Sequence, residues 1–304
     1  MIQIEALSKT YRTGFLMKPK QALLSIDLKV SEGEIFGFIG PNGAGKSTTI
    51  KILTGLLRPS SGKVSVMGSS PQDPRSREKL GFLPEHPYFY DYLTGHELLK
   101  FYGSLSGVRG KLLEERIDWA LTLLHANHDW VHRRLRTYSK GMMQRMGLAQ
   151  AILSKPKLLI LDEPMSGLDP LGRKDVREAI LALNREGCTI FYSSHVLADV
   201  EAISHRVAMI VEGRIVKQGT VEQVTGGEGS EYTVRTSTGL PAALLIPGVR
   251  AILPQEFMCD SPVARDQLIT ACLSNGVGVE RIENNRPSLE EVLTREVAKD
   301  GANG

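Results

Sequence analysis

A chain of 304 residues is long enough to bury one large core or two smaller ones. Its formal net charge of +3 is too small to indicate nucleic-acid binding. No apolar run approaches the roughly 20 residues of a membrane-spanning helix, and the start Met-Ile-Gln-Ile-Glu lacks a secretion-signal pattern, so we expect a cytosolic protein. Cys188, Cys259 and Cys272 lack the paired spacing of a metal site and are expected to be reduced core thiols.

A glycine-rich loop follows the apolar run Ile35–Ile39, which predicts a buried strand. The loop has the pattern Gly-x-x-x-x-Gly-Lys-Ser, whose glycines turn backbone N–H groups toward phosphate oxygens. Lys46 adds a positive charge, the Ser47 hydroxyl can bind Mg²⁺, and a helix predicted over 48–57 directs its positive N-terminus at the phosphates. The sequence therefore predicts a nucleotide site that contains Gly40, Pro41, Asn42, Gly43, Ala44, Gly45, Lys46, Ser47 and Thr48.

The segment from residue 85 to 153 reads mainly as helices, one of which is predicted over Met143–Leu153. Thr94-Gly-His-Glu97 is a capping box that predicts a helix start. Just before it, Tyr88-Phe-Tyr-Asp-Tyr92 places four aromatic residues in five positions, and the sequence leaves open whether they pack in the core or form a contact surface. His125, His128 and His132 recur at helical offsets, but without a cysteine or glutamate among them we expect a solvated helix end rather than a metal site.

Two carboxylates follow a second buried strand, which is predicted over Leu158–Leu161. Because side chains alternate along a strand, Asp162 and Glu163 are expected to point in different directions, one to hold Mg²⁺ and the other to face an attacking water. The run 190–194 predicts another strand that ends at His195, where an imidazole can hydrogen-bond a γ-phosphate or the water.

The motifs between about residues 2 and 220, and the order in which they follow one another, resemble those of the ATP-binding subunit of ABC transporters. Tyr138-Ser-Lys-Gly-Met142 matches the family signature, Asp162 the Walker B aspartate, Glu163 the catalytic glutamate and His195 the switch histidine. Residues 166–169 match the D-loop, and Tyr11 stands where an aromatic ring stacks on adenine. The resemblance implies an α/β P-loop NTPase fold of the ABC ATPase type, with ATP and Mg²⁺ as cofactors.

The same resemblance implies two kinds of partner. Two ATPase subunits close head to tail, so that Ser139 and the N–H of Gly141 reach the γ-phosphate held by Lys46 of the other subunit. An integral membrane transporter subunit receives the motion, which places the chain on the inner face of the cell membrane. No nucleic acid is expected.

Three positions depart from the family pattern. Lys140 and Met142 replace the usual residues of the signature, while Ser139 and Gly141 are kept. Glu85 stands where the family has glutamine, and its carboxylate is expected to meet Mg²⁺. The insertion at 14–20 is expected to be a solvated hairpin tip, the alternative being a contact with membrane head groups or a partner.

A polar, glycine-rich linker at 225–230 predicts a domain boundary. It divides an ATPase domain at 1–224, with a helical subdomain at about 86–154, from an accessory α+β domain at 231–304. The predicted order in the latter is strand 231–236, helix 240–246, strands 249–253 and 256–260, helix Pro262–Ser274, strand 277–283 and a final helix. This order is typical of a ferredoxin-like fold. Its role is left open between a dimer or regulatory module and a stabilising tail.

The complete pattern predicts hydrolysis of ATP to ADP and phosphate by a subunit of an exporter whose membrane subunits are separate chains. The ending Pro287-Ser-Leu-Glu-Glu-Val-Leu293 resembles that branch of the family. The alternative is a soluble ABC scaffold ATPase in cofactor assembly or another non-transport role.

Overall fold

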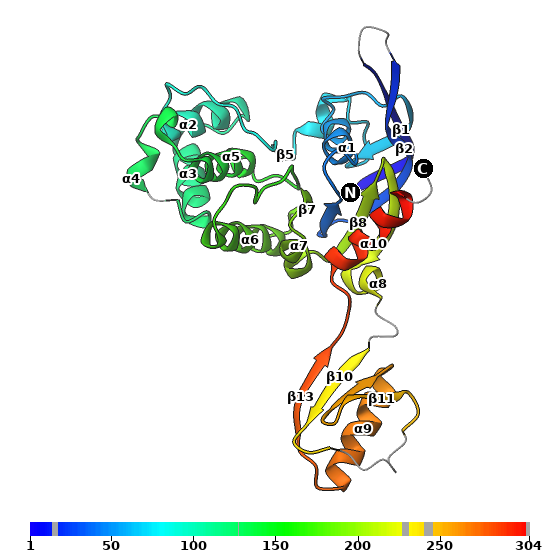
Figure 1. Ribbon diagram of the computed structural model, residues 1–304. Helices are drawn as coiled ribbons and strands as arrows, with labels where there is room; N and C mark the ends of the chain where they lie inside the picture. Colours follow the sequence, from blue (N-terminus) through cyan, green and yellow to red (C-terminus); the bar gives the residue numbers. More distant parts are fainter. Residues whose placement is uncertain (14–17, 127, 227–230, 240–245, 302–304) are drawn as a thin grey trace. The chain divides into compact units, whose positions relative to one another are not determined.

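The computed structural model describes residues 1–13, 18–126, 128–226, 231–239 and 246–301 (Figure 1). They form two compact units, of which the first contains Met1–Gln218 and the second Gly219–Ala298. Among the described helices, none combines the length and the apolar composition needed to cross a bilayer.

The first unit is built on a six-stranded sheet in the order β5-β6-β7-β3-β8-β9. Its strands are β3 (Ile35–Ile39), β5 (Leu80–Leu83), β6 (Leu158–Leu161), β7 (Thr189–Ser194), β8 (Arg206–Val211) and β9 (Arg214–Thr220). From β5 to β8 every neighbouring pair is parallel. Strands β3, β6 and β7 are buried along their whole length, because a parallel sheet is covered on both faces. The residues that follow these three strands therefore meet at one edge of the sheet.

A second, antiparallel sheet in the order β2-β1-β4 packs on the same core. It consists of β1 (Ile2–Thr13), β2 (Lys18–Val30) and β4 (Ser61–Val66). Its inward side chains, such as Ile4 and Leu28, pack in one cluster with Phe36 and Phe38 of β3 and with Ile50 of α1 (Lys46–Leu53). This shared core fixes the position of the phosphate loop between β3 and α1.

The remaining helices of this unit flank the sheets. They are η1 (Pro74–Arg77), α2 (Gly95–Leu105), α3 (Gly110–Leu123), α4 (His128–Val131), η2 (Leu135–Thr137), α5 (Lys140–Ile152), α6 (Pro170–Arg185) and α7 (Leu197–Ile203). Figure 1 shows α2 to α5 gathered on one side of the sheet, away from α1. Both reciprocal bonds of the capping box predicted at Thr94 and Glu97 are present, so that helix start is confirmed.

Two predicted helix bounds were wrong. The helix expected over 48–57 spans Lys46–Leu53, because Gly45 supplies the turn before it and Gly55, at a φ of 75°, ends it. The helix expected to begin at Met143 begins at Lys140, since Ser139 caps it. His125 lies in the turn before α4, at a φ of 49°, so the three histidines do not lie along one helix.

The second unit contains a four-stranded antiparallel sheet in the order β11-β12-β10-β13. Its elements are α8 (Val221–Thr225), β10 (Tyr232–Thr236), β11 (Val249–Leu253), β12 (Glu256–Cys259), α9 (Pro262–Ser274), β13 (Val279–Asn284) and α10 (Leu289–Gly301). Helix α9 has the predicted bounds and is capped by Ser261, and its Leu268 and Cys272 pack on Val234 and Phe257 of the sheet. This strand order is the one expected of a ferredoxin-like domain.

Several predicted features lie outside the described residues. They are most of the helix at 240–246, most of the linker at 225–230, and Phe15, Leu16 and Met17 of the insertion. The insertion's Lys18 and Lys20 belong to β2.

We expect the three cysteines of the native protein to resist thiol reagents. All three are free and buried, and burial raises the pKa of Cys188 to about 12 and that of Cys259 to about 11. At pH 8 the reactive thiolate is therefore a fraction of roughly one in a thousand or less at these two residues. Titration with a chromogenic disulfide reagent should give almost no reaction in buffer and full reaction after denaturation. Rapid reaction of the native protein would contradict this expectation.

Candidate functional site

The phosphate loop closes tightly between β3 and α1. A Cβ atom on Gly40 would collide with the backbone carbonyl of Ile210, and Gly45 has a φ of 117°, so both positions require glycine. The ammonium of Lys46 donates to the carbonyl oxygens of Gly40 at 2.6 Å and of Pro41 at 3.3 Å. The loop thereby holds a buried positive charge beside its own backbone N–H groups.

Asp162 and Glu163 follow β6 and point to different partners. Oδ1 of Asp162 accepts from the hydroxyl of Ser193 at 2.7 Å, and that hydroxyl accepts from the backbone N–H of Glu163 at 2.9 Å. Glu163 has a φ of 52°, a left-handed conformation that is uncommon for residues other than glycine. This turn directs its carboxylate to Lys46, with Oε1 3.4 Å from the ammonium.

His195, which directly follows β7, contacts Glu163. Its Nδ1 lies 2.7 Å from Oε2 of Glu163, and its backbone N–H donates to the same oxygen at 3.2 Å. The structure thus brings Lys46, Glu163 and His195 together, as the sequence predicts. The carboxylate is held on both sides while the imidazole stays half exposed.

A polar hollow of about 460 Å³ surrounds these side chains. It is lined by the phosphate loop together with Glu85, Glu163, Ser166 and His195. Ser47 and Glu85 are among its lining residues, whereas the buried Asp162 is not, and its Oδ1 accepts from Ser193. Such a set of oxygen donors fits Mg²⁺, which prefers carboxylate and hydroxyl ligands.

Tyr11 lies beside Thr48 in the first turn of α1. Its hydroxyl is 3.4 Å from that of Thr48, and the ammonium of Lys9 lies 5.4 Å from the centre of its ring. An aromatic ring is therefore present beside the phosphate loop.

Ser139 and Gly141 lie in a different hollow, of about 570 Å³, at the start of α5. Its lining also includes Lys140, Met142 and Asp169, and it shares no residue with the lining of the phosphate hollow. Within the described part of one chain, Ser139 and Lys46 therefore line two separate hollows.

Two further residues support the site but were not predicted. Ser193 bridges Asp162 and the backbone of Glu163, and the available signal was a pair of serines at the end of a buried strand. Gln144, buried on α5, donates its amide to the carbonyl oxygens of Glu163 at 3.4 Å and of Pro164 at 3.2 Å. No local pattern connects this residue to a loop that lies 19 positions away.

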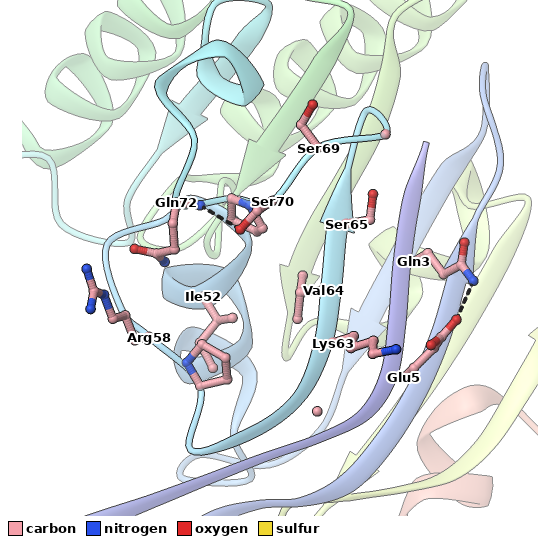
Figure 2. Close-up of a pocket in the computed structure, with 14 residues that line it drawn as sticks. Gln3, Glu5, Ile52, Arg58, Lys63, Val64, Ser65, Ser69, Ser70 and Gln72 are labelled. Atoms are coloured by element: carbon pink, nitrogen blue, oxygen red, sulfur yellow. Dashed lines mark hydrogen bonds between the residues drawn. The ribbon is translucent and has the colours of Figure 1, made fainter.

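A larger hollow, of about 780 Å³, lies between β4 and residues 68–72 (Figure 2). Figure 2 shows Arg58 and Lys63 on opposite sides of it, and Glu5 accepting from the amide of Gln3 at 2.6 Å. Its lining includes neither the phosphate loop nor Asp162 and Glu163. Volume alone therefore does not identify the catalytic site.

A phosphate loop, two carboxylates after β6 and a histidine after β7 define a P-loop ATPase of the ABC type. Residues 23–166 match the family model described as ABC transporter. The chain is 36% identical to YxlF of Bacillus subtilis, an ABC transporter ATP-binding protein described as uncharacterized, over 98% of this chain and 99% of that one. This protein therefore belongs to the ATP-binding subunits of ABC transporters and is an ATPase.

Two other similarities agree with this assignment. The daunorubicin resistance ATP-binding protein DrrA3 of Streptomyces coeruleorubidus is 31% identical, with 90% of each chain covered. A solved ATP-binding subunit of an ABC transporter is 30% identical and superimposes with a TM-score of 0.67, over 74% of this chain and 91% of that one.

Proposed function

We propose that this chain hydrolyses ATP to drive export through a separate membrane subunit of a bacterial transporter. The observation that carries the hydrolytic role is the Glu163 carboxylate, which is held between Lys46 and His195 in the phosphate hollow. Export is supported by the similarity to a drug-resistance ATP-binding protein. The chain would then be cytoplasmic and peripheral on the inner face of the cell membrane.

The reaction requires positioning and charge stabilisation rather than a covalent intermediate. The phosphate loop and Lys46 hold the β- and γ-phosphates of ATP, and Tyr11 stacks on the adenine. Glu163 orients the attacking water and accepts its proton, while His195 holds the carboxylate and contacts the γ-phosphate. Ser47, Asp162 and Glu85 would hold Mg²⁺, which supplies positive charge to the phosphate oxygens.

Two copies of the chain are needed to complete one site. The separation of the two hollows within one chain supports a head-to-tail dimer, in which Ser139 and Gly141 contact the ATP of the other copy. Lys140 and Met142 leave these contacts available, because Ser139 caps α5 and stays exposed at its start. We place the ATPase domain at 1–224, the linker at 225–230 and the accessory domain at 231–304.

The aromatic segment before α2 is the proposed docking site for the membrane subunit. Tyr88, Tyr90 and Tyr92 are 92%, 51% and 59% exposed, whereas Phe89 is half-buried with its ring 5.8 Å from that of Tyr102. Tyr88 and Phe89 line a hollow of about 380 Å³ that is suited to a partner helix. The partial burial of Phe89 agrees with the core interpretation, and the exposure of Tyr88 beside this hollow supports the contact-surface interpretation.

Replacing Tyr88 and Phe89 together by alanine is expected to abolish co-purification with the membrane subunit. Each aromatic anchor at a well-packed interface is worth roughly 1 to 4 kcal/mol, and neither residue touches the phosphate hollow. The matched control is Tyr90→Ala with Tyr92→Ala, because these exposed rings lie 5.7 Å apart but do not line the docking hollow. Normal co-purification of a stable Tyr88, Phe89 variant would refute the docking site.

Purification of a tagged copy in detergent tests the transport role itself. Recovery of a multi-spanning membrane protein is the expected result. Recovery of soluble partners alone would replace the exporter with a scaffold ATPase in cofactor assembly.

A further inference from the structure

An ion pair joins α6 and α7, the helices that follow β6 and β7 in the chain. Nη1 of Arg177, on α6, lies 2.6 Å from Oδ1 of Asp199, on α7. The Asp199 side chain is 4% exposed and that of Arg177 is 31% exposed. Within the described residues, the other oxygen of Asp199 is buried and has no hydrogen-bond partner, so Arg177 is the group that compensates this buried charge.

In the first turn of α7, this pair acts together with the burial of Leu197 and Val200. The helix contains seven residues, and its N-cap, Val196, makes no side-chain capping bond. A helix of this length is not stable by itself. At its far end the Ser204 hydroxyl lies 2.7 Å from that of Tyr192, whereas Asp199 in the first turn is held by Arg177.

The pair is also placed to influence the reaction. Helix α7 begins two residues after His195, and α6 begins directly after Asp169, the last residue of the D-loop match. A displacement of the first turn of α7 therefore moves the imidazole relative to the Glu163 carboxylate, 2.7 Å away. Arg177 is thus the link through which α6 sets the position of His195.

We propose that Arg177 and Asp199 are positioning residues for hydrolysis, which hold His195 against Glu163 and connect it to the D-loop helix. This inference rests on the proposed role of His195. Neither Arg177 nor Asp199 lines the phosphate hollow, so their effect is on the chemical step rather than on ATP binding.

Kinetics of Arg177→Met test the proposal. We expect kcat to fall about tenfold, with KM for ATP within about twofold of the parent, because a small displacement of a catalytic group costs rate but not ground-state binding. Arg177→Lys should restore much of the rate, since it returns the charge. Lys174→Met is the matched control, because Lys174 pairs with Glu178 at 3.8 Å on the exposed side of the same helix, and it should keep the parent kcat. If Arg177→Met does not fold, Asp199→Asn, which keeps the side-chain shape, takes its place.

A double-mutant cycle separates positioning from general stability. In a His195→Ala background, Arg177→Met should lower kcat no further, because the residue through which it acts is gone. Multiplicative losses would overturn the inference, as would a lower melting temperature with parental kcat at a temperature where the variant is folded. A parental rate for His195→Ala itself would refute the proposed role of His195 and with it this inference. The assignment of Lys46 and Glu163 is tested independently of this cycle.

Discussion

Glu163→Gln is expected to reduce ATP hydrolysis by roughly a hundredfold to ten-thousandfold while ATP binding is retained. The amide keeps the shape of the side chain and its position beside Lys46 and His195. It loses the basic oxygen that accepts a proton from the attacking water. Phosphate release measures the rate, and a fluorescent ATP analogue measures the affinity.

The uncleaved γ-phosphate of this variant should also hold two copies of the chain together. Size determination with ATP and Mg²⁺ should therefore show a dimer that disappears when ADP replaces ATP. Glu186→Gln is the matched control, because this exposed carboxylate at the end of α6 has the same chemistry but lies outside the phosphate hollow. A Glu163→Gln variant that turns over at the parental rate, or stays monomeric with ATP, would contradict the assignment.

Lys46→Ala is expected to weaken ATP binding by roughly tenfold to a hundredfold. A charge-assisted hydrogen bond to phosphate contributes about 1.5 to 3 kcal/mol, and Lys46 is the buried cation of the loop. The fold should persist, because the loop is shaped by glycine conformations and by the packing of β3 and α1 rather than by this side chain. Titration with fluorescent nucleotide gives the affinity, and thermal melting verifies the fold.

Lys51→Ala provides the comparison for this measurement. Lys51 is exposed in the last turn of the same helix, so its removal changes the net charge equally without reaching the phosphates. If Lys46→Ala binds ATP as Lys51→Ala does, the loop is not the nucleotide site.

The sequence predicted the catalytic edge because its parts are local. Strands β3, β6 and β7 read as short apolar runs, and they are followed by the phosphate loop, by the two carboxylates and by His195 respectively. Parallel strands place their ends at one edge, so Lys46, Glu163 and His195 were expected to meet there. The positions of the second unit's strands along the chain and the bounds of α9 followed from turn and capping residues for the same reason.

Errors in the prediction arose where backbone conformation overrides residue preference. The end of α1 depended on Gly55, and the start of α5 depended on Ser139, whose hydroxyl accepts from the N–H of Met142 at 3.2 Å. The left-handed backbone of Glu163 was not predicted either, because glutamate rarely adopts it. Such conformations are imposed by neighbouring strands and cannot be read from the residue itself.

What the sequence alone determined is which residue types follow the buried strands, namely a glycine-rich loop with a lysine, two carboxylates and a histidine, and from these it predicted the chemistry of the site. Only the tertiary structure decided which groups hold them in place. Ser193, Gln144 and the pair of Arg177 with Asp199 act across strands or helices that are 19 to 31 positions apart in sequence. Their contacts depend on how whole elements pack, because a side-chain hydrogen bond requires a geometry that no local pattern encodes. The separation of Ser139 from Lys46 into two hollows was likewise a property of the packed chain.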